Sequence, residues 1–175
     1  MRRTVRIAAD PFDPEAEIAA FRQALQNAGQ NAGGMVSFTG LVRPSASGGA
    51  VSTLSLQHYP GMTERGIEGM LDEVASRWPL EAAMVIHRVG AMQPHEPIVL
   101  VVTASGHRRA AFEAADLLMD YLKSRALFWK SETGAQGKVW IEPRDEDYAD
   151  AARWDDRQGL NHRSPSWPRD GGHDG

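Results

Sequence analysis

The amino-acid sequence predicts an α+β fold built as a single domain. Three segments place apolar side chains at helical spacing, and six short runs rich in β-branched and aromatic residues are typical of strands. These elements come in the order α-β-β-α-β-β-α-β-β, which favours a layered α+β architecture. A chain of 175 residues, with 42% hydrophobic and 24% charged residues, is long and apolar enough to bury one core.

The first half of the chain is expected to hold two helices and two strands. Ile18 and Leu25 recur at helical spacing in the first helix, and Ile67 and Val74 belong to an apolar stripe on the second. The segment PSASGGA (44–50) is a flexible loop by composition, so the strands on either side of it are expected to form a hairpin over 34–59. The expected elements are a helix over 14–28, strands over 34–43 and 51–60, and a helix over 62–78.

The second half is expected to contain four strands and the longest helix. The continuous apolar run in PIVLVVTAS (97–105) predicts a strand that is buried on both faces. The other strands are expected over 82–90, 127–133 and 138–142. The helix over 108–125 is expected to direct an apolar stripe at the core, namely Phe112, Ala115, Leu118, Met119 and Leu122.

The last 21 residues differ from the rest in composition. From Asp155 onwards the sequence is polar, rich in Gly and Pro, and without a period. Such a segment cannot bury enough apolar surface to fold. We therefore expect one domain over 1–154 and a disordered tail over 155–175.

Composition excludes several classes of function. The formal net charge of −4 argues against a general nucleic-acid binder. No apolar run approaches the roughly 18 residues of a membrane span, and the N-terminus lacks the apolar stretch of a signal peptide, so a cytoplasmic location is expected. The chain has no cysteine, which excludes a disulfide, a Cys-ligated zinc and a thiol nucleophile. No pair of histidines has the spacing of a metal site, so we expect neither a metal nor a cofactor.

The first candidate site is the strand-to-helix junction in TASGHRRAAFEAA (103–115). The free N–H groups and the positive dipole end of a helix favour an anion, and His107 and Arg108 add basic side chains at that end. The pattern predicts a phosphate or carboxylate site. It is explained equally well if Ser105 caps the helix and the arginine side chains are simply solvated.

The second candidate is a pair of lysines in DYLKSRALFWK (120–130). Lys123 and Lys130 are two of only three lysines, whereas sixteen basic residues are arginine. Lys123 falls at the end of the long helix, where a cation suits the dipole, and this is a sufficient structural reason for it. Lys130 follows an apolar and aromatic run, where a partly desolvated amine can act as a nucleophile or carry a proton. Snorkelling of its ammonium to solvent is the alternative.

The third candidate is Arg43, which ends the first predicted strand beside the 44–50 loop. An arginine there can clamp an anion with two hydrogen bonds, although such residues are more often plain surface charges. Arg108 and Lys123 are fifteen residues apart on one predicted helix, or roughly 22 Å at about 1.5 Å per residue. A single site that used both would therefore lie across the interface of an isologous dimer.

Several segments, in order from about Gly34 to Trp154, resemble the MoaE family, the large catalytic subunits of molybdopterin synthase. These segments are SFTGLVR, LQHYPGMTE, RWPL, VIHRVG, SGHRRAAFEAADLLMDYLKSRALFWK and a closing RW. The resemblance covers most of the chain, and its longer segments are highly specific. It implies an α/β hammerhead fold with antiparallel sheets and about three helices.

The resemblance also implies a function. Members of the family transfer sulfur from the C-terminal Gly-Gly thiocarboxylate of a small ubiquitin-like, MoaD-type subunit to cyclic pyranopterin monophosphate. The product is the dithiolene of molybdopterin. The large subunits form a homodimer, with one small subunit at each end of a heterotetramer.

Carried over by position, the family's basic site residues fall on the candidates named above. Substrate binding is implied for His107 and Arg108 of one subunit with Arg43 of the other. The implied catalytic residues are Lys123 and Lys130, near the incoming thiocarboxylate. Lys123 is favoured as the acid and base, or as the amine that engages the acyl carbon.

Two other classes of function stay open at this point. A non-catalytic scaffold that docks a ubiquitin-like protein would not need the two lysines, and both are present. An anion-dependent hydrolase could use His107, but the sequence supplies no obvious nucleophile or metal site for it.

Overall fold

A four-stranded mixed sheet forms the centre of the molecule, with strand order β1-β5-β7-β2. β1 (Arg2–Ala8) runs parallel to β5 (Leu80–Arg88), whereas β7 (Pro97–Ser105) is antiparallel to both β5 and β2 (Gly34–Leu41). β2 is therefore an edge strand of this sheet. The structure is a computed structural model, and it describes residues 1–46, 49–124, 128–134, 137–141 and 145–154.

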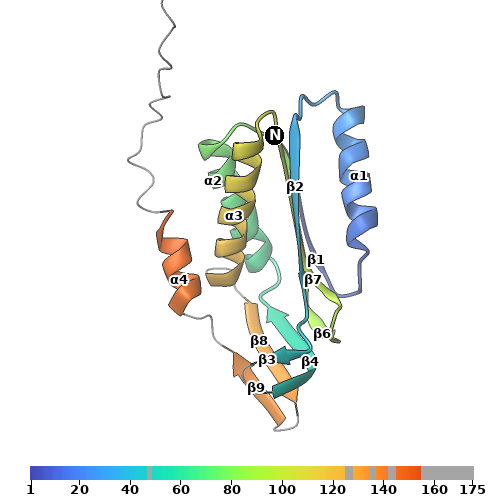
Figure 1. Ribbon diagram of the computed structural model, residues 1–175, viewed down its shortest axis with the longest axis vertical. Helices are drawn as coiled ribbons and strands as arrows, with labels where there is room; N and C mark the ends of the chain where they lie inside the picture. Colours follow the sequence, from blue (N-terminus) through green and yellow to red (C-terminus); the bar gives the residue numbers. More distant parts are fainter. Residues whose placement is uncertain (47–48, 125–127, 135–136, 142–144, 155–175) are drawn as a thin grey trace, which may run out of the picture.

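Helices cover both faces of this sheet (Figure 1). α1 (Pro14–Asn27) lies on one face, and α2 (Met62–Arg77) and α3 (Arg108–Ser124) lie on the other. α1 begins after Asp13, whose carboxylate accepts hydrogen bonds from two backbone N–H groups of the first turn. α2 packs on β1 and β5, while α3 packs on β7 and β2, so the two helices follow the order of the strands beneath them. Within the described ranges, no helix is long and apolar enough to cross a membrane.

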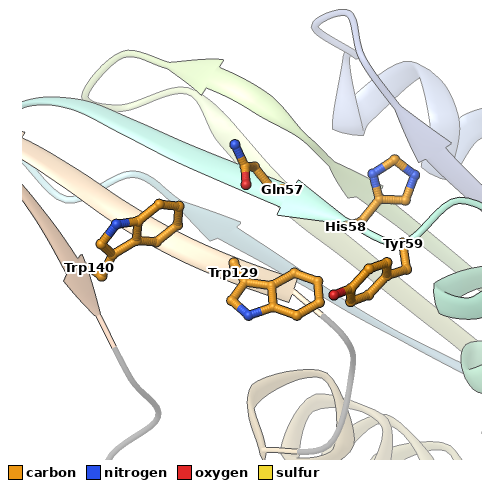
Figure 2. Close-up of a pocket in the computed structure, with 5 residues that line it drawn as sticks. All are labelled: Gln57, His58, Tyr59, Trp129 and Trp140. Atoms are coloured by element: carbon orange, nitrogen blue, oxygen red, sulfur yellow. The ribbon is translucent and has the colours of Figure 1, made fainter.

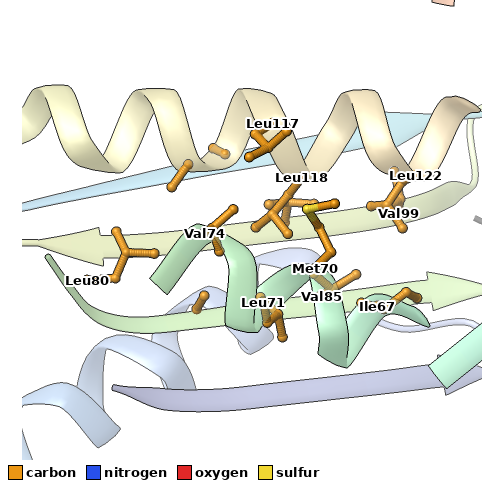
Figure 3. Close-up of a cluster of buried hydrophobic side chains, with 14 of the residues drawn as sticks. Ile67, Met70, Leu71, Val74, Leu80, Val85, Val99, Leu117, Leu118 and Leu122 are labelled. Atoms are coloured by element: carbon orange, nitrogen blue, oxygen red, sulfur yellow. The ribbon is translucent and has the colours of Figure 1, made fainter. Parts of the chain in front are cut away.

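The main core lies between the sheet and the pair α2 and α3 (Figure 3). Leu71 and Val74 of α2 and Leu118 of α3 are fully buried there. A second apolar layer, which includes Phe21 and Leu25 of α1, covers the other face of the sheet. Because β5 and β7 contribute to both layers, their side chains are buried on both faces, which confirms the prediction for β7.

A smaller antiparallel sheet lies at one end of the molecule (Figure 1). Its central strand is β4 (Gly49–His58), which pairs with β8 (Phe128–Gly134), β3 (Ser45–Ala46) and β6 (Gly90–Met92). β8 also pairs with β9 (Gly137–Ile141). The predicted strand, turn and strand after α3 are thus confirmed as far as the described residues extend.

The last described segment of the chain, α4 (Asp145–Ala152) and the two residues that follow it, packs against α3. Trp154 is 2% exposed and donates its Nε1–H to Asp120 Oδ2 at 2.7 Å. The Arg153 guanidinium donates to the same carboxylate oxygen, also at 2.7 Å. The Trp154 ring packs edge-on against Trp78, with centroids 5.8 Å apart. These contacts hold α4 in place.

Several expectations from the sequence are wrong. The strands expected over 34–43 and 51–60 do not form a hairpin, because β2 pairs with β7 and β4 pairs with β8 in a different sheet. The loop expected over 44–50 contains the short strand β3. Neither β1 nor α4 is predicted, so the described residues form four helices instead of about three. The tail over 155–175 lies outside the described residues, and its disorder stays a prediction.

Phe112 does not face the core, since 62% of it is exposed. A helix turns by about 100° per residue, which places Phe112 about 40° from Arg108 and about 20° from Lys123. Both of these side chains are exposed. Leu118, by contrast, is buried and lies about 120° away from Phe112. Phe112 therefore belongs to an exposed stripe of α3.

Candidate functional site

The strand-to-helix junction places His107 and Arg108 at the start of α3. Ser105 is fully buried there; its hydroxyl donates to Pro79 O at 2.7 Å and accepts from the His107 backbone N–H at 3.2 Å. The hydroxyl thus fixes the turn, while the His107 and Arg108 side chains face solvent. Ser105 therefore has the structural role that the sequence allowed, and the anion site at His107 and Arg108 stays a prediction.

This junction lies directly against the start of β2. A Cβ added to Gly33 would come within 2.5 Å of Gly106 O, and one added to Gly34 would lie 3.5 Å from the Arg108 Cα. Only a residue without a side chain permits this approach at position 33. His107 and Arg108 therefore stand at the N-terminal end of β2.

Arg43 stands at the opposite end of β2. Val42, which precedes it, is 2% exposed, and its backbone N–H donates to Glu96 O at 2.9 Å. Val42 also packs with Leu56 in a small apolar cluster, and Leu56 lies directly across the β4–β8 pair from Lys130. Arg43, itself exposed, is therefore anchored to the same part of the small sheet as Lys130.

Lys123 lies in the last turn of α3, at the same end of β2 as Arg43. Its side chain is 56% exposed, and its Nζ lies 3.9 Å from Asp147 Oδ1 of α4. The preceding residue, Leu122, is buried beside Val99 in the main core (Figure 3). Val99 pairs with β2 close to the end of that strand, which places the last turn of α3 there.

Lys130 lies on β8, with 35% of its side chain exposed and its Nζ 3.1 Å from Glu132 Oε1. Strand alternation puts it on the same face as Leu56 and opposite to Trp129. Its surroundings are only partly the apolar setting expected, since a half-buried carboxylate holds the ammonium. The two lysines singled out from the sequence thus share one feature, a carboxylate within 4 Å of each amine.

The described residues form two separate basic groups in one chain. His107 and Arg108 make one group at the N-terminal end of α3, and Arg43, Lys123 and Lys130 make the other at its C-terminal end. Fifteen residues of helix put roughly 22 Å between Arg108 and Lys123. One chain alone cannot place both groups against one small molecule, as the sequence predicted.

An open pocket of about 290 Å³, which the sequence reasoning missed, lies on the face of β8 opposite Lys130 (Figure 2). The Trp129 and Tyr59 rings meet edge to face with centroids 4.2 Å apart, and Trp129 and Trp140 are 40% and 54% exposed. The exposed ring faces suit an apolar or flat heteroaromatic group. Two tryptophans on the same face of one predicted strand pair were a signal for it, since Trp140 pairs with Ser131, two residues after Trp129. The lining residues are Gln57, His58, Tyr59, Trp129 and Trp140.

The two histidines near this end of the molecule have structural contacts. His87 stacks on the Phe128 ring at 4.0 Å, and its Nδ1 lies 2.9 Å from Arg88 O. Burial lowers the pKa of His87 to about 4, because the charged ring would lose its hydration. His58 Nε2 lies 3.9 Å from Glu64 Oε1. Among the described residues, no cluster of three or more His, Cys, Asp or Glu side chains could hold a metal ion.

Comparison with known proteins shows which family this chain resembles in sequence. A family model described as MoaE protein matches residues 7–125. The molybdopterin synthase catalytic subunit of Mesorhizobium japonicum is 51% identical over 153 residues, which cover 86% of this chain and 92% of that protein. The same subunit of Ralstonia nicotianae is 48% identical over 151 residues, which cover 86% and 84% of the two chains.

Solved structures agree with the sequence relatives. The molybdopterin biosynthesis MoaE protein from Burkholderia ambifaria matches with a TM-score of 0.72 and 40% identity, and covers 89% of this chain and 99% of that one. Molybdopterin synthase from Staphylococcus aureus matches with a TM-score of 0.69 and 28% identity, and covers 78% and 95%. The family model runs from the end of β1 through α3, and so includes both ends of β2 and α3 where the basic groups lie. The chain belongs to the MoaE family.

Proposed function

We propose that this chain is the catalytic subunit of a molybdopterin synthase, working in the cytoplasm. It takes sulfur from the C-terminal thiocarboxylate of a small ubiquitin-like subunit and places it on cyclic pyranopterin monophosphate. The observation that carries the proposal is the pair Lys123 and Lys130, each beside a carboxylate, in a chain that otherwise uses arginine almost throughout. Arginine supplies positive charge equally well, but only an amine can give up a proton or attack a carbonyl carbon.

The substrate's cyclic phosphate is bound by His107 and Arg108 of one subunit together with Arg43 of the other. Helix N-terminal N–H groups and exposed basic side chains at the start of α3 favour an anion. The Arg43 guanidinium can add two parallel hydrogen bonds to phosphate oxygens. Since these residues lie at opposite ends of β2, the complete site requires a dimer.

The lysines act at the partner's acyl carbon. The thiocarboxylate sulfur bonds to a carbon of the substrate as a C–O bond of that carbon breaks, with the oxygen leaving as water or on the opened phosphate ester, and the bond from sulfur to the acyl carbon then breaks. An oxygen of water replaces the sulfur on the acyl carbon, either directly or after Lys123 has bonded there, and the partner leaves with an ordinary carboxylate. Lys123 carries the proton in this exchange, because it is the more exposed amine and its Asp147 contact, at 3.9 Å, is the looser of the two ion pairs. The chain needs no cysteine, since the sulfur arrives on its partner.

The test is dithiolene formation by the purified chain with the thiocarboxylated small subunit and cyclic pyranopterin monophosphate. Lys123→Arg keeps the charge but removes proton transfer, so the rate is expected to fall about 100-fold or more. Lys138→Arg is the matched control, because Lys138 lies over the Trp140 ring at 4.8 Å, where arginine makes the same cation–π contact.

Two results would contradict the proposal at different levels. A Lys123→Arg or Lys123→Ala variant that converts substrate at the wild-type rate removes the role given to Lys123. A wild-type chain that binds the thiocarboxylated subunit but forms no dithiolene is a non-catalytic scaffold.

A further inference from the structure

We propose that the buried ion pair of Arg88 with Glu96 positions Arg43, the arginine that the proposed function assigns to the substrate's cyclic phosphate. Both members of the pair are positioning residues. They act through the turn over 93–96, which holds the backbone of Val42, the residue before Arg43. The work of Arg43 rests on the proposed function, whereas the hold on Val42 does not depend on it.

The position of Arg43 is set by its backbone. Among the described residues, no hydrogen bond or ion pair holds its exposed side chain. The chain is anchored on either side of it, at Val42 and at Pro44, whose carbonyl accepts the Val51 N–H of β4 at 3.0 Å. Two parallel hydrogen bonds from a guanidinium to a phosphate require a set orientation. The two anchors therefore decide where Arg43 can meet an anion.

The turn over 93–96 binds both backbone groups of Val42. The Val42 N–H donates to Glu96 O at 2.9 Å, and the Val42 carbonyl accepts the His95 N–H at 2.8 Å. The pairing of β2 with β7 becomes irregular just before this point, after Gly40. The two hydrogen bonds to the turn thus hold the chain where the regular ladder ends.

This turn has a conformation that needs support. His95 has a φ of 73°, in the left-handed region that residues other than glycine rarely adopt. Pro94 before such a residue, with the Glu96 N–H donating to Gln93 O at 3.2 Å, is the pattern of a type II turn. The Glu96 carboxylate closes the turn from the other side, since it accepts the Gln93 N–H at 2.9 Å. Backbone in this region persists only where its surroundings determine it.

Arg88, the last residue of β5, ties the turn to the body of the protein. Its side chain is 4% exposed, and its Nη1 donates at 3.0 Å to the same Glu96 oxygen that accepts the Gln93 N–H. Its Nη2 donates to Ala91 O at 3.4 Å. Hydrogen bonds from Gln93 and then Arg88 lower the pKa of the Glu96 carboxyl, so both partners are charged at neutral pH. Within the described part of the chain, Glu96 is the one carboxylate that pairs with this buried charge.

The ion pair lies where the two sheets join. Arg88 ends β5 of the four-stranded sheet just before β6 of the smaller sheet, and Glu96 comes just before β7 of the four-stranded sheet. The segment over 42–44 crosses between the same two sheets, from β2 to β3. The pair therefore fixes the crossing from which Arg43 projects. A role in stability alone would make its loss affect the whole protein and not one ligand.

Glu96→Gln tests the pair, because it keeps the size of the side chain and removes its charge. We expect the KM for cyclic pyranopterin monophosphate to rise about 10-fold, with kcat within about twofold and the KM for the thiocarboxylated small subunit unchanged. Arg43→Ala raises the same KM. In a chain that already carries Arg43→Ala, Glu96→Gln is expected to have no further effect, since it acts through Arg43.

Glu17→Gln is the matched control. It weakens another ion pair with an arginine, that of Glu17 with Arg6, which joins α1 to β1. Both elements are remote in the fold from the turn over 93–96, so kcat and both KM values are expected to stay at the wild-type level.

Amide hydrogen exchange followed by nuclear magnetic resonance tests the hold on Val42 without an assay of activity. In Glu96→Gln the N–H groups of Val42 and His95 are expected to exchange about 10-fold faster or more. The amides at the centre of β7 are expected to keep their wild-type rates, which shows that the variant is folded.

Several results would overturn the proposal. Exchange at Val42 that matches the wild type shows that the ion pair does not hold the turn. A rise in KM that persists in the Arg43→Ala chain, or extends to the small subunit, shows that the pair acts on the fold as a whole. Faster exchange with an unchanged KM, where Arg43→Ala does raise it, shows that Arg43 does not need the turn. A wild-type chain that forms no dithiolene contradicts the proposed function instead, and the exchange rates still decide whether the pair holds Val42.

Discussion

Two glycines of α2, Gly66 and Gly69, allow the packing of this helix to be tested with one substitution at two places. Replacing Gly by Ala in a helix interior removes a propensity penalty of about 1 kcal/mol. At Gly69 an added Cβ meets nothing within 4 Å. We therefore expect Gly69→Ala to raise the free energy of unfolding by about 0.5–1 kcal/mol.

The same change at Gly66 meets a neighbour. An added Cβ would lie 2.6 Å from the Tyr121 hydroxyl oxygen of α3. Ordinary contact requires about 3.4 Å, so the hydroxyl must move by roughly 0.8 Å, and its rigid ring packs against the main core. Overpacking of this kind costs about 1–3 kcal/mol, which cancels or exceeds the gain in propensity. Gly66→Ala is expected to lower the free energy of unfolding by up to about 2 kcal/mol.

Urea denaturation followed by far-ultraviolet circular dichroism measures both variants on the same scale. Thermal midpoints should move in the same directions, by about 2–4 °C per kcal/mol for a chain of this size. If Gly66→Ala stabilises the protein as much as Gly69→Ala, then Tyr121 does not approach α2. The orientation of α3 would be wrong, and with it the position of the exposed stripe beside β2.

Two further predictions concern buried polar groups. The pKa of His87 is about 4 in the folded protein and about 6.5 when unfolded. The unfolded state therefore binds more protons between these two pH values. The free energy of unfolding falls as the pH drops through that range, by about 3 kcal/mol in all. His87→Phe should remove this part of the pH dependence of the urea midpoint; an unchanged slope would place the effect on other groups. Asp120→Asn weakens the two hydrogen bonds that hold Arg153 and Trp154, so we expect a loss of about 2–3 kcal/mol in unfolding free energy. Asp116→Asn weakens an exposed contact to the same arginine and should cost about 0.5 kcal/mol; equal losses would mean that burial of Asp120 is unimportant.

The elements that the sequence predicted well are those whose side chains face a core. The stripe over 62–78 and the apolar run over 97–105 are patterns that burial itself produces. Strand pairing leaves no such pattern, because the partner of β2 is distant in sequence. The expected hairpin over 34–59 failed for this reason. β1 was missed since RRTVRIA has only two large apolar residues, Val5 and Ile7, too few for a clear strand pattern, and its parallel partner β5 lies far along the chain.

For the candidate site too, the local chemistry could be predicted from the sequence, whereas the long-range arrangement could not. Lysine amid arginine was visible in the sequence, as was a basic strand-to-helix junction. The carboxylate beside Lys123 was not, because it comes from α4, whose sequence DEDYADAA has only one buried residue and hence no amphipathic signal. Phe112 was misplaced because a helix of this length carries apolar residues on two sides, and periodicity alone does not say which side a partner covers.

The charges of the shared site connect the proposed dimer to its ligands. In the proposed dimer four positive side chains meet there: Arg43, Lys123, Lys130 and Arg108 of the partner subunit. Asp147 and Glu132 offset two of them, which leaves a net charge of about two from these six side chains. A cyclic phosphate and a thiocarboxylate carry one negative charge each, so both ligands together neutralise the site and either one alone does not.

It follows that, without ligands, the positive side chains of the two subunits repel each other and weaken the dimer. We expect its dissociation constant to rise at low ionic strength, and to fall with inorganic phosphate more than with chloride at equal ionic strength, because phosphate binds between the two subunits. Sedimentation equilibrium of the wild type measures both effects, and Arg43→Ala should remove the difference between the two salts. A dissociation constant that follows ionic strength alone, with the same value in phosphate and in chloride, would show that the basic groups of the two subunits do not meet.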